Sequence, residues 1–111
     1  MTIQEKEILK MKFGMAVMKR IEENKLIAKA NKQKGKLDNV TIDSLRKLEA
    51  SSGIPYASIN QIVNGRKNPS FTTISALLEG LDLKLDEFFT GYYYKISDME
   101  LEKRLKSKKG K

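Results

Sequence analysis

Two short segments with helical hydrophobic patterning follow one another in residues 45–65, and a glycine ends each of them. The first segment ends at Gly53 and the second at Asn64-Gly65. Glycine adopts a positive φ without steric cost, so it lets the chain reverse direction after a helix. Pro55, shortly after Gly53, suits the first position of a helix. The pattern therefore predicts two helices joined by a tight turn and docked on a common core. The side chains expected in that core are Leu48, Ile54, Ile59 and Ile62.

The chain before this pair also has a helical pattern. Apolar residues recur at every fourth position from Phe13, which predicts a helix that ends near Asn24 or continues to Ala30. The polar, glycine-bearing segment 31–39 is predicted to be a loop. Thr41 is predicted to be the N-cap of the next helix.

Two further helices of the domain are predicted after residue 65, and a third short helix is predicted in the C-terminal tail. Ser70 is expected to cap a fourth helix, a short fifth helix covers 85–89, and 98–106 forms a last helix with Glu100–Arg104 and Glu102–Lys106 pairs. The apolar positions expected in the core are Phe71, Ile74, Leu77, Leu78, Leu81, Leu85, Phe88 and Phe89. No segment alternates like a half-buried strand. The predicted class is all-α, a compact domain of four to five helices.

The composition narrows the function. With 22 Lys+Arg against 14 Asp+Glu, the 111-residue chain has a formal charge of +8, which indicates a polyanionic partner. The charge is concentrated at the ends, because residues 1–40 hold ten basic and five acidic side chains and residues 92–111 hold seven and three. The chain has no cysteine and no histidine, so thiolate and imidazole catalysis and their metal sites are excluded. No apolar run reaches the length of a membrane span. We expect a cytoplasmic binding protein without catalytic residues, cofactor or metal.

The exposed face of the predicted helix after Pro55 suits the reading of base edges. Asn60 and Gln61 can pair with adenine N6 and N7, and Ala57 can contact a thymine methyl group. Tyr56 can donate to the DNA backbone or pack on it. An α-helix fits the major groove, so an amide-rich face on a short, exposed helix has a clear physical use.

The segment Phe13–Phe89 resembles the Cro/lambda-repressor-like (XRE-type) helix-turn-helix family. The resemblance rests on Ser51–Ile54, Ser58-Ile59, Ile62–Ser70 and Leu85–Phe89. It implies that the helix-turn-helix motif covers about 45–65 and that the helix 55–64 is the recognition helix. By that resemblance the base-reading positions are Tyr56, Ala57, Asn60 and Gln61. The phosphate-binding positions are Ser44, Asn64, Arg66, Lys67, Ser70 and the backbone amide of Phe71.

The chain departs from the family pattern at four places. A lysine-rich insertion, 29–39, separates the first two helices. Leu45 stands where the family has a phosphate-binding glutamine, so Ser44 is its substitute. Glu49 stands where a small residue is usual, so it must turn outward, pair with a lysine of the first helix, or widen the helix crossing. Asp82 replaces a glycine after the fourth helix and is expected in the left-handed region.

These observations predict a sequence-specific regulator of transcription, a repressor, that binds double-stranded DNA as a homodimer on a palindromic operator. The alternative is an antitoxin or other interaction protein whose C-terminal tail binds a partner protein and which regulates its own operon. The expected divisions are an N-terminal arm (1–12), the DNA-binding domain (13–91) and a basic tail (92–111). Tyr92–Tyr94 are expected to cover the edge of the core or to form a dimer contact.

Overall fold

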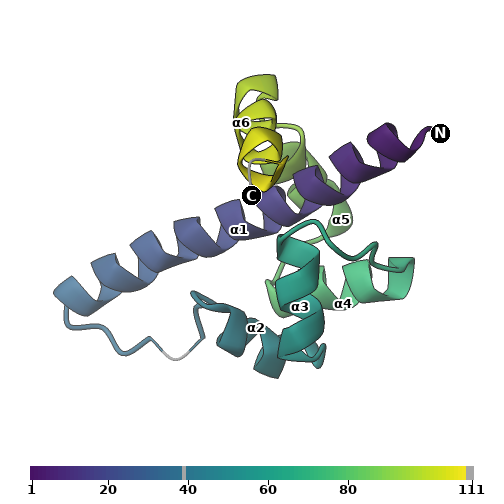
Figure 1. Ribbon diagram of the computed structural model, residues 1–111. Helices are drawn as coiled ribbons and strands as arrows, with labels where there is room; N and C mark the ends of the chain where they lie inside the picture. Colours follow the sequence, from purple (N-terminus) through teal and green to yellow (C-terminus); the bar gives the residue numbers. More distant parts are fainter. Residues whose placement is uncertain (39, 110–111) are drawn as a thin grey trace.

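The computed structural model describes residues 1–38 and 40–109, and these residues form six α-helices, one π-helical turn and no strand. The all-α prediction is therefore confirmed. One long helix, α1, runs across the molecule with α2, α3 and α4 on one side of it and α6 on the other (Figure 1). The elements are α1 (Ile3–Gln33), α2 (Leu45–Ser52), α3 (Tyr56–Val63), α4 (Phe71–Gly80), α5 (Leu85–Phe88), η1 (Phe89–Tyr93) and α6 (Asp98–Lys109).

Helix α1 has 31 residues and is therefore about 46 Å long, which accounts for the 49 Å long axis of the molecule. It begins ten residues before the predicted start at Phe13, because residues 3–12, predicted as an N-terminal arm, are helical and continuous with the rest of α1. Thr2 and Glu5 form a capping box, in which each side chain accepts a hydrogen bond from the other's backbone N–H. The hydrophobic pattern does not indicate this start, because most side chains before Met11 are exposed or only partly buried.

The central helices end and begin where the backbone signals predict. Gly53 ends α2 with φ of 77°, Asn64 is the C-cap of α3, and Gly65 follows with φ of 71°. Ser70 caps α4 through a hydrogen bond that its Oγ accepts from the backbone of Thr73. The predicted N-cap Thr41 is wrong. Ser44 caps α2 by accepting from Lys47 N, because Thr41 is held three residues earlier by Asp38.

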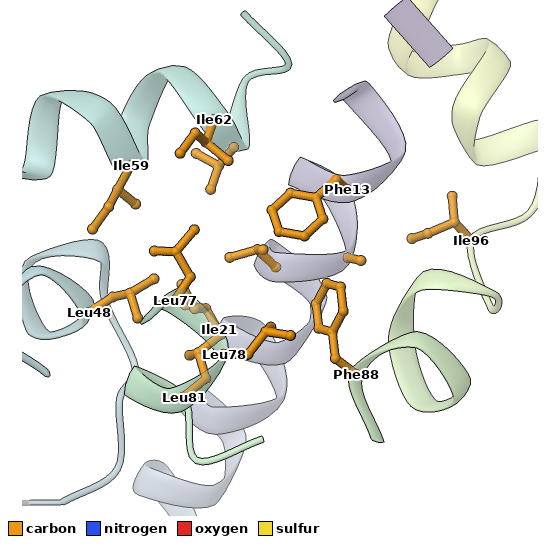
Figure 2. Packing of buried hydrophobic residues seen from close by; sticks show 13 residues of the cluster. Phe13, Ile21, Leu48, Ile59, Ile62, Leu77, Leu78, Leu81, Phe88 and Ile96 are labelled. Atoms are coloured by element: carbon orange, nitrogen blue, oxygen red, sulfur yellow. The ribbon is translucent and has the colours of Figure 1, made fainter. Parts of the chain in front are cut away.

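The core lies where α1 meets α3, α4 and α5 (Figure 2). Its largest fully buried side chains are Phe88, Met11, Ile21, Leu48, Ile59, Ile62, Leu77, Leu78, Leu81 and Val17. The prediction is wrong for two core positions, because Phe71 is 68% exposed and Leu85 is 39% exposed. Both are the first residue of their helix, where the apolar face that packs inward has not yet begun.

Gly14 brings α1 and α3 into direct backbone contact. A Cβ atom added to Gly14 would lie 2.6 Å from the carbonyl oxygens of both Ile62 and Val63. Real side-chain carbons do not approach that closely, so α3 can only sit at this distance because residue 14 has no side chain. This close approach sets the position of the exposed face of α3 relative to the rest of the fold.

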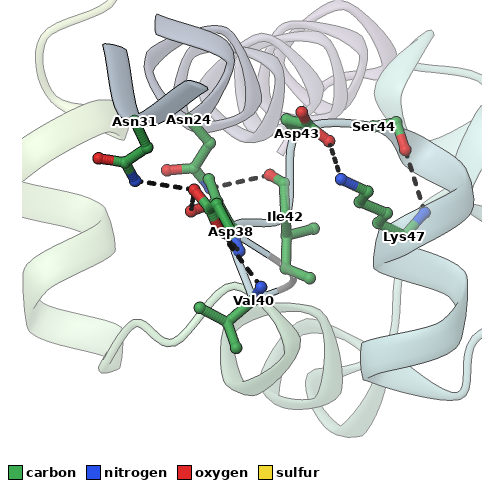
Figure 3. Close-up of polar contacts among 9 residues, drawn as sticks. Asn24, Asn31, Asp38, Val40, Ile42, Asp43, Ser44 and Lys47 are labelled. Atoms are coloured by element: carbon green, nitrogen blue, oxygen red, sulfur yellow. Dashed lines mark hydrogen bonds and ion pairs between the residues drawn. The ribbon is translucent and has the colours of Figure 1, made fainter. Parts of the chain in front are cut away.

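The segment between α1 and α2 is held to α1 by side-chain hydrogen bonds (Figure 3). The Asp38 carboxylate accepts from Asn31 Nδ2 at 2.8 Å, from Thr41 N at 2.9 Å and from Thr41 Oγ1 at 2.6 Å. The buried Asn24 donates from Nδ2 to Ile42 O at 2.9 Å. The lysine-rich insertion 29–39 thus begins as the last turn of α1. The connection that follows is held to α1 by these hydrogen bonds, which fix where α2 begins. Asn39 lies outside the described residues.

Acid should weaken this connection. The hydrogen bonds from Thr41 and Asn31 hold the pKa of Asp38 well below its usual range. Because the folded pKa is depressed, the stabilisation is present above the unfolded pKa of about 4 and is lost as pH falls below it. We expect Asp38→Asn to lower the urea midpoint at pH 7, and we expect the gap from wild type to shrink below about pH 4. A gap that does not change between pH 7 and pH 3 would contradict this assignment.

The C-terminal elements pack against α1. Arg20 donates to Tyr92 Oη at 2.9 Å and to Leu81 O at 3.3 Å, and Tyr92 donates to Glu23 Oε1 at 2.8 Å. Burial raises the pKa of Tyr92. Tyr93 is also half-buried, so these two tyrosines cover the edge of the core, whereas Tyr94 is exposed. Among residues 1–38 and 40–109, no helix is long and apolar enough to cross a membrane.

Helix α6 (Asp98–Lys109) confirms the last helix predicted over 98–106 and extends three residues beyond it. Leu101 packs on the core, next to the buried Ile96 that precedes the helix. The predicted pair Glu100–Arg104 is wrong, because Glu100 accepts instead from Lys19 Nζ of α1 at 2.9 Å. This hydrogen bond from Lys19, with one from the Ser97 backbone, holds the pKa of Glu100 below its usual range.

Candidate nucleic-acid interface

Helix α3 has one buried and one exposed face. Ile59, Ile62 and Val63 are buried against α1 and the other helices. The predicted base-reading residues are on the other face: Ala57, Asn60 and Gln61 are exposed and Tyr56 is partly exposed. The alternation follows from the helical period, since residues one turn apart share a face. All four predicted residues therefore remain accessible along a single short helix.

Glu49 fixes the N-terminal end of α3. Its Oε2 accepts a hydrogen bond from Tyr56 N at 2.9 Å, which satisfies one of the free N–H groups at the start of the helix. Pro55 provides no side-chain cap there, so Glu49 supplies it. Of the alternatives for Glu49, a pair with a lysine of the first helix is wrong, since its ion pair is with Arg46 of its own helix at 3.6 Å.

Arg46 lies over the ring of Tyr56. The guanidinium carbon is 3.9 Å from the ring centroid, within the range of a cation–π contact. The contact holds a largely exposed positive charge beside the first turn of α3. The sequence does not single out Arg46. Its proximity to Tyr56 depends on how α2 and α3 cross, and no pattern in the sequence indicates that crossing.

A chain of amide contacts runs along the C-terminal end of α3. Asn64 Nδ2 donates to Asn60 O at 2.7 Å and lies 3.2 Å from Asn60 Oδ1. Asn64 Oδ1 accepts from Arg104 Nη2 of α6 at 3.0 Å. These contacts hold the carboxamide of Asn60, a predicted base-reading group, in one orientation. They also place the guanidinium of Arg104 beside α3, although 40 residues separate Arg104 from Asn64 along the chain.

The other predicted phosphate-binding residues surround α3. Lys67 Nζ lies 3.2 Å from Ser58 Oγ, so the turn after α3 folds back along that helix. Arg66 and Ser70 are exposed in and after the same turn, and the exposed Phe71 begins α4. Ser44 is the N-cap of α2. The described residues contain no group of three or more acidic side chains arranged to hold a metal ion.

The arrangement combines an exposed helix, amide side chains on its outer face, and cationic groups on both sides of it. A family model described as "Helix-turn-helix" matches residues 42–88, which are α2 to α5 with their connections. Residues 42–88 are thus similar to the XRE-type helix-turn-helix family. In this helix-turn-helix domain, α2 and α3 are the two helices of the motif and Gly53 lies in the turn between them.

The family match is shorter than the resemblance expected from Phe13 to Phe89. It begins after α1 and ends before η1. Outside the matched segment, α1 packs on α3 and α6 packs on α1. The family is one of DNA-binding regulators of transcription, which supports that role for the domain. No curated protein and no solved structure was found to match the chain.

Proposed function

We propose that this protein is a sequence-specific repressor of transcription that reads the major groove of double-stranded DNA with α3. The observation that carries the proposal is the outer face of α3, where Ala57, Asn60 and Gln61 are exposed within a helix-turn-helix domain. Amide side chains can make bidentate contacts with adenine, and an α-helix fits the major groove. Occupying a site near a promoter is enough to exclude other proteins from it, so repression needs no further surface.

The proposed contacts divide into two classes. The base-reading residues are Tyr56, Ala57, Asn60 and Gln61. The residues that bind the DNA backbone are Ser44, Arg66, Lys67, Ser70 and the Phe71 amide. Asn64, the sixth position that the resemblance implies, is not one of them because its side-chain amide donates to Asn60. Backbone contacts fix the register of the protein on DNA and contribute no direct sequence information. The dimer on a palindromic operator belongs to the same proposal, with one α3 in each half-site and half-sites about one helical turn apart.

Selection of bound duplexes from a random library tests the proposal. The full chain is incubated with the library at about 150 mM salt, since DNA affinities have meaning only at a stated ionic strength. We expect an enriched inverted repeat. Enrichment of a single, non-repeated site would retain sequence-specific binding and reject the dimer. Binding without any enriched sequence would reject the proposed function.

Gln61→Ala should relax the preference for one base pair in each half-site. The exposed amide of Gln61 can accept and donate to one base, and its loss should cost about 1–3 kcal/mol on the enriched site. Binding to a scrambled duplex should change little. Lys67→Ala is the matched control, because loss of a phosphate contact should weaken both duplexes equally. The assignment of α3 as the reading helix fails if Gln61→Ala selects the same site as wild type with the same affinity.

A further inference from the structure

The contacts of Asn64 leave its side chain poorly placed to bind a phosphate itself. A phosphate oxygen accepts hydrogen bonds, so its protein partner must donate. The Asn64 amide nitrogen is directed at Asn60 O and Oδ1, and its oxygen accepts from Arg104 Nη2. The donor that faces outward at this end of α3 is therefore the guanidinium of Arg104 rather than the carboxamide of Asn64.

The position of Arg104 is fixed by the docking of α6 on α1 (Figure 1). Lys19 Nζ donates to Glu100 Oε1 at 2.9 Å, and Glu100 Oε2 accepts from Ser97 N at 2.9 Å. Leu101, the next residue, packs on the core. Because Arg104 lies one helical turn after Glu100, it is on the same side of α6 and extends toward α3. Glu100 and Arg104 both line a groove of about 550 Å³ that also includes Asn60 and Asn64.

The chemistry of Arg104 suits a phosphate. The guanidinium has five N–H donors in a planar fork, and the contact with Asn64 uses one of its nitrogens. The residue is exposed, so the remaining donors can reach a ligand. Among the described residues the ion pairs do not include Arg104, and its charge is not neutralised by a carboxylate.

We propose that Arg104 binds a phosphate of the DNA backbone next to the C-terminal end of α3, and that Asn64 holds its guanidinium in place. The inference rests on the proposed function and extends the DNA-binding surface beyond the helix-turn-helix domain to α6. Arg104 is a backbone contact, so it contributes affinity and register without reading sequence.

The test compares Arg104→Ala with Lys106→Ala in the full chain. Both variants remove one positive charge from α6, and the two positions are about 200° apart around the helix. Affinity for a labelled mixed-sequence duplex and for the duplex enriched by selection is measured between about 50 and 200 mM salt. Thermal melting by circular dichroism checks that α6 remains folded in both variants.

We expect Arg104→Ala to bind both duplexes about eightfold more weakly at 0.1 M salt and to reduce the slope of log K against log salt by about 0.9, the value for one phosphate. Lys106→Ala should change the slope much less, and Arg104→Lys should keep most of the wild-type slope because it keeps the charge.

The outcomes separate this inference from the function on which it rests. If wild type binds neither duplex in a salt-dependent way, the proposed function fails and the inference fails with it. If wild type binds but Arg104→Ala matches it, only the role of Arg104 is wrong. Equal losses in Arg104→Ala and Lys106→Ala would indicate a general effect of charge and overturn the inference. Tighter binding by Arg104→Ala would also overturn it, because α6 would then obstruct the DNA.

Discussion

Replacing Gly14 with alanine is expected to destabilise the fold by about 3 kcal/mol, at the upper end of the usual cost of overpacking. The added methyl group would lie 2.6 Å from the carbonyl oxygens of Ile62 and Val63 and 2.8 Å from the Val63 carbonyl carbon. These are backbone atoms, so no side-chain rotation can relieve the overlap. Either α3 moves away from α1 or the helices distort. Urea unfolding followed by circular dichroism measures the effect.

The sign of this effect is informative, because alanine is intrinsically the better helix former by about 1 kcal/mol. A glycine in a helix with open space around it should therefore become more stable on substitution. Gly91 is the matched control: no atom lies within 4 Å of its added Cβ, and its φ is not positive. We expect Gly91→Ala to raise the urea midpoint slightly, in the opposite direction to Gly14→Ala. If Gly14→Ala is as stable as wild type, α1 and α3 do not pack as closely as described.

The ends of the central helices could be predicted because their signals are local. A positive φ at Gly53 and Gly65, the left-handed Asp82 with φ of 58°, and the cap at Ser70 each depend on a few neighbouring residues. The hydrophobic period of α4 likewise needs only its own sequence, since Leu77 and Leu78 are buried as predicted. Because these signals are local, the sequence predicts where the helices of the motif end and where α4 begins.

The features that sequence reasoning did not predict depend on contacts between distant residues. Whether Thr41 or Ser44 caps α2 is decided by Asp38, which holds Thr41 outside the helix. The role of Glu49 as the cap of α3 depends on how two helices cross. Periodicity alone gives the face of a helix but not where burial begins along it, and for this reason it predicts a buried Phe71, which is exposed.

The candidate interface divides in the same way. The exposure of Ala57, Asn60 and Gln61 follows from the helical period and agrees with the prediction. The involvement of Arg104 could not be predicted, because its partner Asn64 is 40 residues away and the intervening chain must first fold. A sequence pattern identifies which helix can read DNA. The tertiary fold decides which distant cations stand beside that helix.

Phe88→Ala should destabilise the fold by about 3–5 kcal/mol, the usual cost of removing a fully buried phenylalanine. Phe88 is completely buried and forms ring contacts with Phe13 of α1 at 5.4 Å and with Tyr92 of η1 at 6.3 Å between centroids. Its loss leaves a cavity between α1 and the elements that carry α6, so the C-terminal part of the chain should detach at a lower urea concentration than the rest.

Phe71→Ala is the matched control, because it removes the same group from a side chain that is 68% exposed. We expect its free energy of unfolding to lie within about 0.5 kcal/mol of wild type, as for a surface substitution. Its DNA affinity should also be retained, since the proposed contact of Phe71 is its backbone amide. The two unfolding curves thus test the core and the interface with the same chemical change. Similar losses in both variants would show that Phe71 is buried in solution, and the N-terminal end of α4 would then not be the open surface that DNA binding requires.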